Sequence, residues 1–330
     1  IGTYQFIVAP IALGLLRRAN LPRHIGLVAM FVAFNAATYC LPGTPVTTNV
    51  LPATILGTGI FSGAGIGIVA FVLCTVLGLG YAYWLIGVAR KQSLGFEETA
   101  SAGVVGFGAG APAAERTEEN TPPLWNAVVT IILLFGLCIL FSQKWTGLDA
   151  TQGVVLAQLI AAAWALITNY NRMNHGTRLV DISRGTLAIV PLAIMLGFMS
   201  GFGAVVQSTA AFGALQNLLT SINANPYLLT FFGVAILSGC LGNGTGGIVM
   251  VLNALAPTLM ASGANLGAIH RLTAMTASTL DSLPHSTYVC VSLQVFGLNH
   301  KAGYKYVFVS TVLIPIIYSL VCTILCILIY

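Results

Sequence analysis

The stretch "TLDSLPHST" (Thr279–Thr287) brings an acid, a proline and a histidine into five positions, although the sequence on both sides is apolar. Asp281 is the one acidic residue that lies deep in such sequence. At a bilayer centre a carboxylate costs about 2.5–3.5 kcal/mol even on the mild scale from insertion experiments. An idle, unpaired aspartate is therefore not expected there, and Asp281 becomes the first candidate functional residue.

The composition around this stretch is that of a membrane protein. The chain has 330 residues, of which 57% are hydrophobic and 6% charged, and its mean hydropathy is +0.91. A soluble domain carries about 25% charged residues. Most apolar runs are long enough for helices that cross about 30 Å of hydrocarbon, and the alternation typical of outer-membrane strands is missing. We expect an all-α polytopic protein of the inner (cytoplasmic) membrane.

The formal charge of +5 lies in short loops. Basic residues gather at positions 17–23, 90–91, 172–184 and 301–305, and the positive-inside rule places these clusters in the cytoplasm. Such a distribution indicates membrane orientation rather than nucleic-acid binding. The seven cysteines form no CxxC pair and no obvious metal set, so we expect neither a metal nor a cofactor.

Long and short apolar segments alternate along the chain. Long segments occupy 1–16, 25–40, 63–88, 124–141, 153–168, 187–206, 226–241, 248–260 and 306–330, and shorter ones occupy 46–56, 210–219, 266–280 and 288–298. Short apolar pieces interrupted by Gly or Pro are typical of re-entrant hairpins and broken helices in transporters. The sequence therefore predicts an ion-transporter-like fold with such elements.

The two ends of the chain contain a weak repeat. "LPGTPVTTNVLPATILG" (Leu41–Gly57) aligns with "LPHSTYVCVSLQVFGLN" (Leu283–Asn299) at an offset of 283 − 41 = 242 residues, with identical Leu, Pro, Leu and Leu at four positions. At this offset the basic clusters of one half align with uncharged positions of the other half. Because basic clusters mark the cytoplasmic face, equivalent positions of the two halves are expected on opposite faces of the membrane. This pattern predicts inverted-topology repeats.

The repeat also divides the chain. We expect 1–88 to be the remainder of a first repeat, 89–123 a cytoplasmic linker, 124–179 connecting scaffold helices, and 180–330 the second repeat. The first residue falls within the hairpin of the first repeat. We therefore expect the N-terminal part to be missing, with about 60 or more residues before it in the natural protein.

"GNGTGG" (Gly242–Gly247) interrupts an apolar run. Consecutive glycines can turn several backbone N–H groups toward one point, and the positive end of a following half-helix suits a carboxylate. The alternative is close packing of helices through small residues. The candidate solute-binding residues here are Ser238, Asn243, Gly244, Thr245 and Gly246.

"CLPGTPVTTN" (Cys40–Asn49) ends a helix between two prolines. Its neutral hydroxyls and amide can recognise the hydroxyl groups of a solute without the cost of burying a charge. A helix kink with internally satisfied threonines is the alternative. Gly43, Thr44, Thr47 and Asn49 are the candidate binding residues.

In the opening stretch, burial disfavours the charged form of a carboxyl group, so Asp281 is a candidate proton carrier. His285 lies four positions on, titrates near neutral pH and can share this role. Ser282, His285 and Ser286 are further candidates for solute binding. The alternatives are a structural aspartate that caps the broken helix at Pro284 and a histidine at the membrane interface.

Two further positions remain open. Ser208 and Thr209 follow a predicted span and can line the site or form a hinge. Arg271 is the other charge near a break, and we expect it to extend to the outer interface rather than to contact an anion.

At these residues the chain resembles the gluconate:proton symporter (GntP) family of the ion transporter superfamily. The resemblance rests on "VVQSTAAF" (205–212), "SGCLGNGTGGIVMVLNALAP" (238–257), "AIHRLTAMTASTLDSLPHSTYVCVSLQVFGLNHKAGYKYVF" (268–308) and "TYCLPGTPVTTNVLPATILGTG" (38–59). It implies proton-coupled uptake of sugar acids or other small hydroxy-carboxylates by an elevator-like movement, and a homodimer. Ser286 and Thr287 stand where better-known members are expected to have Asn and Gly.

These observations predict a secondary active transporter that couples uptake of an organic anion to protons through Asp281. Sodium coupling and an anion channel are the alternatives. An intramembrane hydrolase needs HExxH, a GxSG-type serine or paired aspartates, none of which the sequence contains. We therefore expect no enzyme activity.

Overall fold

The computed structural model describes residues 3–44, 46–99, 123–141, 150–172, 208–221 and 224–330, together with Ser183, Ile194, Phe198, Gly201 and Val205. These residues form helices and turns and contain no strand. Most of the predicted span at 187–206 and of the predicted linker lies outside the described residues. The chain has two compact units, one of residues 1–110 with 192–330 and one of residues 111–191.

The smaller unit contains two helices that pack against each other, α5 (Leu124–Phe141) and α6 (Ala150–Asn169), followed by a short 3-10 turn, η5 (Tyr170–Arg172). The Asn126 side chain is buried and donates to Thr168 Oγ1 at 3.1 Å and to Asn169 Oδ1 at 3.0 Å. Interhelical hydrogen bonds of this kind hold helices together where both are apolar. The unit overlaps the predicted connecting helices at 124–179.

The described first half of the larger unit contains four α-helices, with an interruption between the second and the third. Its elements are α1 (Thr3–Arg18), α2 (Arg23–Asn35), the π-helical turn η1 (Ala36–Cys40), α3 (Thr47–Leu56), α4 (Ala64–Lys91) and the 3-10 turn η2 (Glu97–Thr99). Pro42 lies between η1 and α3. A proline has no backbone N–H, so a helix cannot continue through this residue without losing a hydrogen bond.

The second half begins with α8 (Ala210–Ser221), and from its third helix onward it repeats the helix order of the first half. Its further elements are α9 (Pro226–Leu241), α10 (Gly244–Ala261), α11 (Leu266–Thr276), α12 (Thr287–Val295), α13 (His300–Phe308), the π-helical turn η6 (Val309–Leu313) and α14 (Ile314–Ile329). Helices α9 and α10 form a hairpin, and α11 and α12 are separated by the break that contains Asp281.

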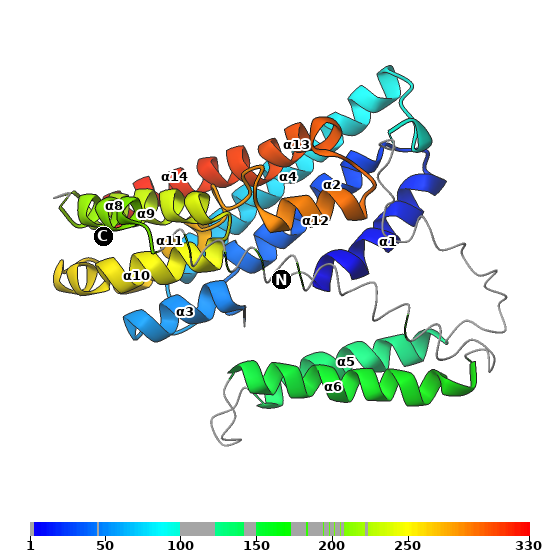
Figure 1. The fold of residues 1–330 in the computed structure, drawn as a ribbon, viewed down its shortest axis with the longest axis horizontal. Coiled ribbons are helices and arrows are strands. Elements are labelled where there is room, and N and C mark those ends of the chain that lie inside the picture. The colour runs from blue at the N-terminus through cyan, green and yellow to red at the C-terminus, as the bar shows by residue number, and fades with distance from the viewer. Residues whose placement is uncertain are drawn as a thin grey trace. The chain divides into compact units, whose positions relative to one another are not determined.

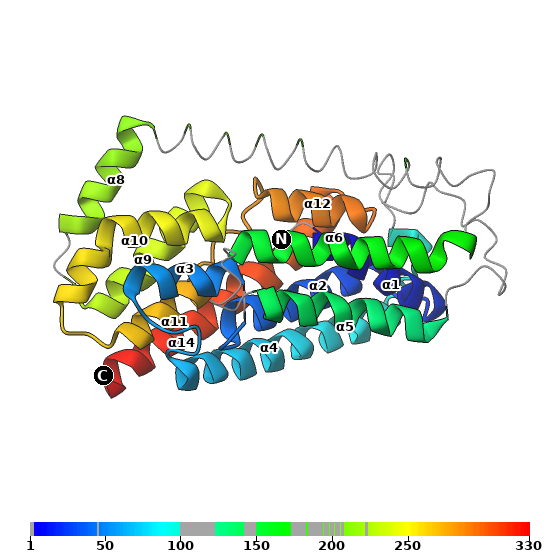
Figure 2. The same ribbon diagram turned by 90° about the horizontal axis from the view of Figure 1, so that it is seen from below.

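Inverted repeats are visible in the helix boundaries. A shift of 242 residues carries α1 to 245–260 and α2 to 265–277, which overlap α10 and α11. In Figure 1, α1 runs from the middle of this unit toward its right end, whereas α10 runs toward its left end. Accordingly α3 packs against α10, as Figure 2 also shows, and α12 packs against α1. The same helix order thus occurs twice in opposite directions.

Three helices in the described part are long and apolar enough to cross a membrane: α4, α10 and the continuous helix of residues 300–329. Helix α4 exposes apolar side chains on its outer face, with Val72 50%, Val76 63% and Leu79 59% exposed. An apolar stripe that faces outward along a helix of this length fits hydrocarbon and not water. The chain is an all-α polytopic membrane protein, as its composition predicts.

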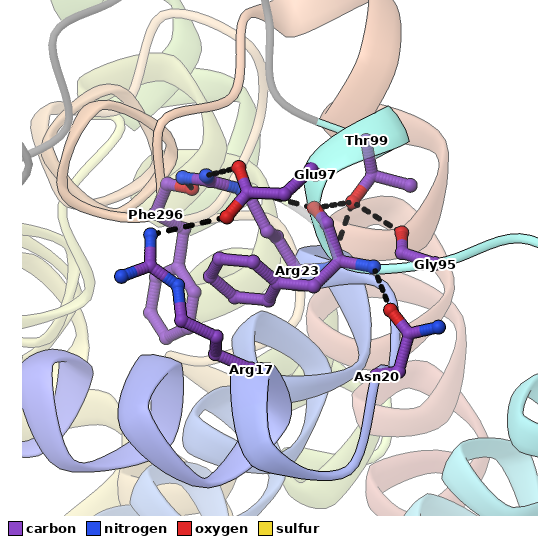
Figure 3. A network of polar contacts seen from close by, with 8 residues as sticks. Arg17, Asn20, Arg23, Gly95, Glu97, Thr99 and Phe296 are labelled. Carbon is purple, nitrogen blue, oxygen red and sulfur yellow. Dashed lines mark hydrogen bonds and ion pairs between the residues drawn. The ribbon is translucent and has the colours of Figure 1, made fainter.

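Basic residues lie together at one end of this unit, where α1 ends, α2 begins, α4 ends and α13 begins (Figure 1). There Glu97 forms ion pairs with Arg17 at 3.2 Å and with Arg23 at 3.5 Å. Arg23 is buried and also donates to the carbonyls of Phe96 and Phe296 (Figure 3). We call this the charged end. One membrane face rich in basic residues is what the positive-inside rule requires.

The charged end also orders the start of the predicted linker. Phe96 is 3% exposed, and the Arg23 guanidinium lies 4.3 Å from its ring centroid. The backbone N–H of Phe96 donates to Asn20 Oδ1 at 3.1 Å, and Arg23 N–H donates to Thr99 Oγ1 at 3.1 Å (Figure 3). Residues 94–99 therefore pack onto the α1–α2 corner instead of extending into solvent.

Close contact between α2 and α4 depends on Gly78, because an added Cβ would overlap the Val32 side chain. We expect Gly78→Ala to force these helices apart and to lower the free energy of unfolding by about 1–3 kcal/mol. Thermal melting of the purified protein in detergent measures the change. Gly80→Ala on the same helix is the matched control, because no atom lies within 4 Å of its added Cβ. Equal melting temperatures for both variants would contradict this account of the packing.

Candidate functional site

Three interruptions of helices meet at Asp281. They are the hairpin tip Gly242–Gly247, the first break (residues 36–44) and the second break (residues 277–286), and we call their meeting point the crossing. Each interruption leaves backbone groups without their helical partners. Inside a membrane such groups are tolerated only where protein or water surrounds them. The meeting of the three interruptions supplies that protein environment.

The Asp281 carboxyl group is held by hydroxyl groups. Tyr39 OH donates to its Oδ2 and Ser282 Oγ donates to its Oδ1, each at 2.8 Å, and Asp281 is 7% exposed. Within the described ranges both ion pairs use Glu97, so no cation there neutralises Asp281. A hydroxyl can donate to a carboxylate and accept from a carboxylic acid. The same partners therefore suit both protonation states of Asp281.

Tyr39 is the repeat mate of Asp281, because 281 − 242 = 39. Residues near the axis that relates two inverted halves contact their own equivalents, and this pair does so across 242 positions of sequence. Tyr39 is 4% exposed, and its ring packs edge-on against Phe34. Sequence reasoning missed Tyr39 as a site residue, although the repeat offset already carried the signal.

The positive end of α10 lies beside Asp281. Asn243 caps this helix through its Oδ1, which accepts from Gly246 N–H at 3.3 Å. A Cβ added to Gly244 would lie 3.0 Å from Asp281 Oδ2 and 3.1 Å from Tyr39 OH. Only the absence of a side chain lets the helix end approach the carboxyl group so closely. The N-terminus of a helix carries partial positive charge and favours an anion next to it.

The second break is also tied to the hairpin tip. Ser286 Oγ donates to the carbonyl of Gly242 at 3.0 Å. Ser282 and Ser286 are buried, whereas His285 and Asn243 are exposed. Of the predicted solute-binding residues, Gly244, Ser282 and Ser286 are thus brought together around Asp281. The roles of His285 and Asn243 stay predictions.

Three buried hydroxyl groups near the tip have no hydrogen-bond partner in the described part of the chain. They are Ser238 Oγ on α9, Thr245 Oγ1 on α10 and Thr276 Oγ1 on α11. Ser238 is fully buried and lies against Gly247 of the tip. An unsatisfied buried hydroxyl costs free energy, which a polar ligand offsets by hydrogen bonding to it. Ser238 and Thr245 belong to the residues predicted from sequence.

The first break is locked internally. The carbonyl of Ile60 accepts from Gly43 N–H at 3.1 Å, Asn49 Nδ2 at 3.1 Å and Arg271 Nη2 at 2.9 Å. Asn49 Nδ2 also donates to the carbonyl of Thr44, and Asn49 Oδ1 accepts from His270 Nε2 at 2.9 Å. We call this network the latch. It engages the amide of Asn49 within the protein and joins α11 of the second half to the first half.

Thr44 and Thr47, which the sequence also predicts as binding residues, do not use their side chains in the latch. Thr44 Oγ1 donates to the carbonyl of Leu41 at 3.1 Å, which closes a local turn. Thr47 is exposed at the start of α3. Their part in solute binding stays a prediction.

Arg271 is fully buried, and the expectation that it extends to the outer interface is wrong. Its Nε and Nη2 donate to the carbonyl of Ser62 at 3.3 and 3.1 Å, while Nη1 has no partner among the described residues. Helix α11 is enclosed by α3, α4, α9 and α14, so its side chains have no path to the surface. Arg271 is thus a fixed, buried cation without a carboxylate partner in the described part.

Ser208 and Thr209 lie just before α8 and are exposed. Ser208 Oγ donates to the carbonyl of Val205 at 2.8 Å, as expected for a chain that turns at the end of a helix. Helix α8 contacts α10, whose first turn belongs to the crossing. Whether these residues bind solute or form a hinge stays open.

Comparison with known proteins gives one relative. The chain is 23% identical, over 348 aligned residues, to an uncharacterised transporter, YxjC, of Bacillus subtilis (strain 168). The alignment covers 93% of this chain and 71% of the relative. No family model matches the chain. No solved structure matches it either.

Gly244 tests the geometry of the crossing, because its added Cβ would also lie 2.8 Å from the backbone carbonyl of Ala277. We expect Gly244→Ala to push α10 away from the second break and to cost about 1–3 kcal/mol of stability. Thermal melting in detergent measures this. Gly246→Ala is the matched control, since the closest atom to its Cβ would be the flexible end of Leu241 at 3.1 Å and the next, on Asn243, lies at 3.8 Å. If Gly246→Ala destabilised the protein as much as Gly244→Ala, close approach at Asp281 would not be the reason.

Proposed function

We propose that this protein is a proton-coupled secondary active transporter that imports small hydroxy-carboxylates such as gluconate-like sugar acids. A transporter rather than an enzyme is supported by the relative's name and by the apolar helices. The observation that carries the proposal is the buried Asp281 carboxyl group, bound by hydroxyl groups and placed beside the positive end of α10. An ionisable residue deep in a membrane protein marks an ion or proton pathway.

The coupling follows from competition for the end of α10. When Asp281 is ionised, its carboxylate occupies the favourable position beside Gly244. Protonation removes that charge and leaves the helix end able to attract the carboxylate of a solute. The proton and the anion therefore bind together, and the site releases both together when Asp281 ionises again.

The buried charges support the same order of events. Arg271 and ionised Asp281 sum to zero, whereas Arg271 with protonated Asp281 leaves one positive charge. An unbalanced charge is costly in a medium of low dielectric constant. A bound carboxylate restores neutrality, so the protonated protein favours an anion. Nη1 of Arg271 has no hydrogen-bond partner in the described part of the chain. In this proposal it is the donor that loses its partner when the anion leaves.

The hydroxyl groups of the solute define its class. Near the hairpin tip, Ser238, Thr245 and Thr276 carry buried hydroxyls that have no partner within the described ranges, and each can both donate and accept. A solute that carries several hydroxyls beside one carboxylate satisfies these groups, whereas an acid without hydroxyls leaves them unpaired. A site whose buried polar groups would stay unpaired discriminates strongly against an acid that lacks hydroxyls. This supports hydroxy acids over simple fatty acids.

Alternating access follows from the inverted repeats. In this proposal the hairpin α9–α10 moves with the solute, in the manner of an elevator, while the latch keeps the first break and α11 in place. Inverted halves allow one arrangement to open to each side of the membrane. The crossing is then exposed to each side in turn.

Asp281→Asn tests the coupling role. We expect the variant, reconstituted into proteoliposomes as the full chain, to bind a hydroxy acid but to lose uptake driven by an inward proton gradient, because an amide cannot exchange the proton. Radiolabelled gluconate or another member of a sugar-acid panel that stabilises the protein is the solute. Accumulation against a concentration gradient by Asp281→Asn would contradict the proton role.

The same assay separates the alternative functions. Replacement of sodium by choline leaves uptake unchanged if protons drive it. Loss of uptake on sodium removal, with no response to a pH gradient, would favour a sodium-coupled transporter. Downhill flux that no gradient concentrates would favour a channel.

Arg271→Gln tests the charge balance. We expect this variant to bind the solute about 30-fold more weakly or worse, as is typical when one partner of a buried charge pair is removed. The measurement is the solute-induced rise in melting temperature relative to each variant's own baseline. Arg23→Gln is the matched control, because Arg23 is also buried against backbone carbonyls but lies at the charged end. Unchanged solute stabilisation in Arg271→Gln would contradict the role of this cation.

A further inference from the structure

We propose that a cleft at the charged end binds the headgroup of an anionic glycerophospholipid. The cleft has a volume of about 400 Å³ and lies where the last turns of α4 meet the start of α2 and the junction of α13 with η6. It is separate from the crossing and shares no residue with it. Its polar lining, which we call the rim, consists of buried His24 and exposed Gln92 and Lys305, and its walls include Leu85, Val88 and Val309.

The rim is built to receive negative charge. The His24 ring stacks on Tyr306 with centroids 3.8 Å apart and planes within 4°, which fixes the direction of its ring N–H. Lys305 is exposed, and its Nζ lies 4.8 Å from the centroid of the same Tyr306 ring. Lysine, imidazole and amide side chains all donate hydrogen bonds to phosphate oxygens. The three side chains line the same cleft.

Among the side chains that the structure describes, none that lines the cleft is acidic. The described acid at this end, Glu97, is bound by Arg17 and Arg23 (Figure 3). Its charge is therefore already balanced and does not oppose an anion at Lys305. Arg90 and Lys91 follow the cleft-lining residues of α4 and are exposed, so they add to the positive potential. Basic clusters at the ends of membrane helices attract anionic lipids.

The walls indicate a lipid instead of a soluble anion. The cleft is lined by residues of α4 between Tyr81 and Ala89, and the outer face of this helix is apolar, with Leu79 59% and Trp84 60% exposed. Acyl chains attached to a headgroup at Lys305 can lie along this face, which belongs to a helix of membrane-spanning length. Trp and Tyr side chains are enriched at the level of lipid headgroups. Charge at the rim and hydrocarbon below it match a phospholipid.

The test compares ligands on the delipidated full-length protein in detergent. We expect phosphatidylglycerol to remain bound in native mass spectrometry and to raise the melting temperature, whereas phosphatidylcholine binds at least about fivefold more weakly. One lysine near an anionic surface accounts for roughly this factor. Inorganic phosphate is the third ligand, and we expect no stabilisation from it at the same concentration.

Lys305→Gln is expected to weaken phosphatidylglycerol binding about fivefold. Lys301→Gln is the matched control, because Lys301 is exposed one turn earlier on α13 and does not line the cleft. Val88→Phe fills the cleft without a change of charge and is expected to weaken binding as well. Equal losses in Lys301→Gln and Lys305→Gln, equal binding of both lipids, or equal stabilisation by phosphate would each overturn the proposal.

Discussion

The hydrogen bond from Tyr39 to Asp281 joins the two halves of this protein where both their helices are broken. Within a bilayer, a broken helix exposes backbone groups that hydrocarbon cannot satisfy. Each half therefore needs the other half to cover its break, and the inverted arrangement brings the two breaks to one place. The aspartate adds a second requirement, because its carboxyl group needs polar partners at the same depth. Tyr39, Ser282 and the end of α10 supply them.

The two sides of the crossing differ in their bonding. On the side of the first break, the latch uses Asn49, His270 and the Nε and Nη2 groups of Arg271 to hold the loop around Ile60. Among these groups of the described part, only Nη1 of Arg271 is left for another partner. On the other side, around the tip, one hydroxyl each of α9, α10 and α11 is buried and has no partner among the residues that the structure describes. A rigid side next to an incompletely bonded side is a suitable basis for a site that changes conformation, since few bonds have to be broken on the side that moves.

Charge is distributed over the structure according to access to water. At the charged end, exposed Arg17 and buried Arg23 both pair with Glu97, whose side chain is 70% exposed, so water screens these ion pairs. Near the crossing, the described interior holds a single aspartate and a single arginine, each bonded to neutral groups. Their sparse bonding makes the interior sensitive to one proton or one anion. The exposed charges at the end of the unit are not sensitive in this way.

The sequence by itself determined the helical membrane class and the positions of the breaks, and it singled out Asp281 as a candidate. These features depend on local composition, because hydropathy, proline and glycine act over one or two helical turns. The repeat offset of 242 residues was also visible. Only the tertiary structure decided that Tyr39 meets Asp281, that Asn49 is bound within the latch, and that Arg271 is buried instead of extending to the surface. Such partners lie more than 200 residues apart in the chain, and packing of whole helices brings them together, which no local pattern records.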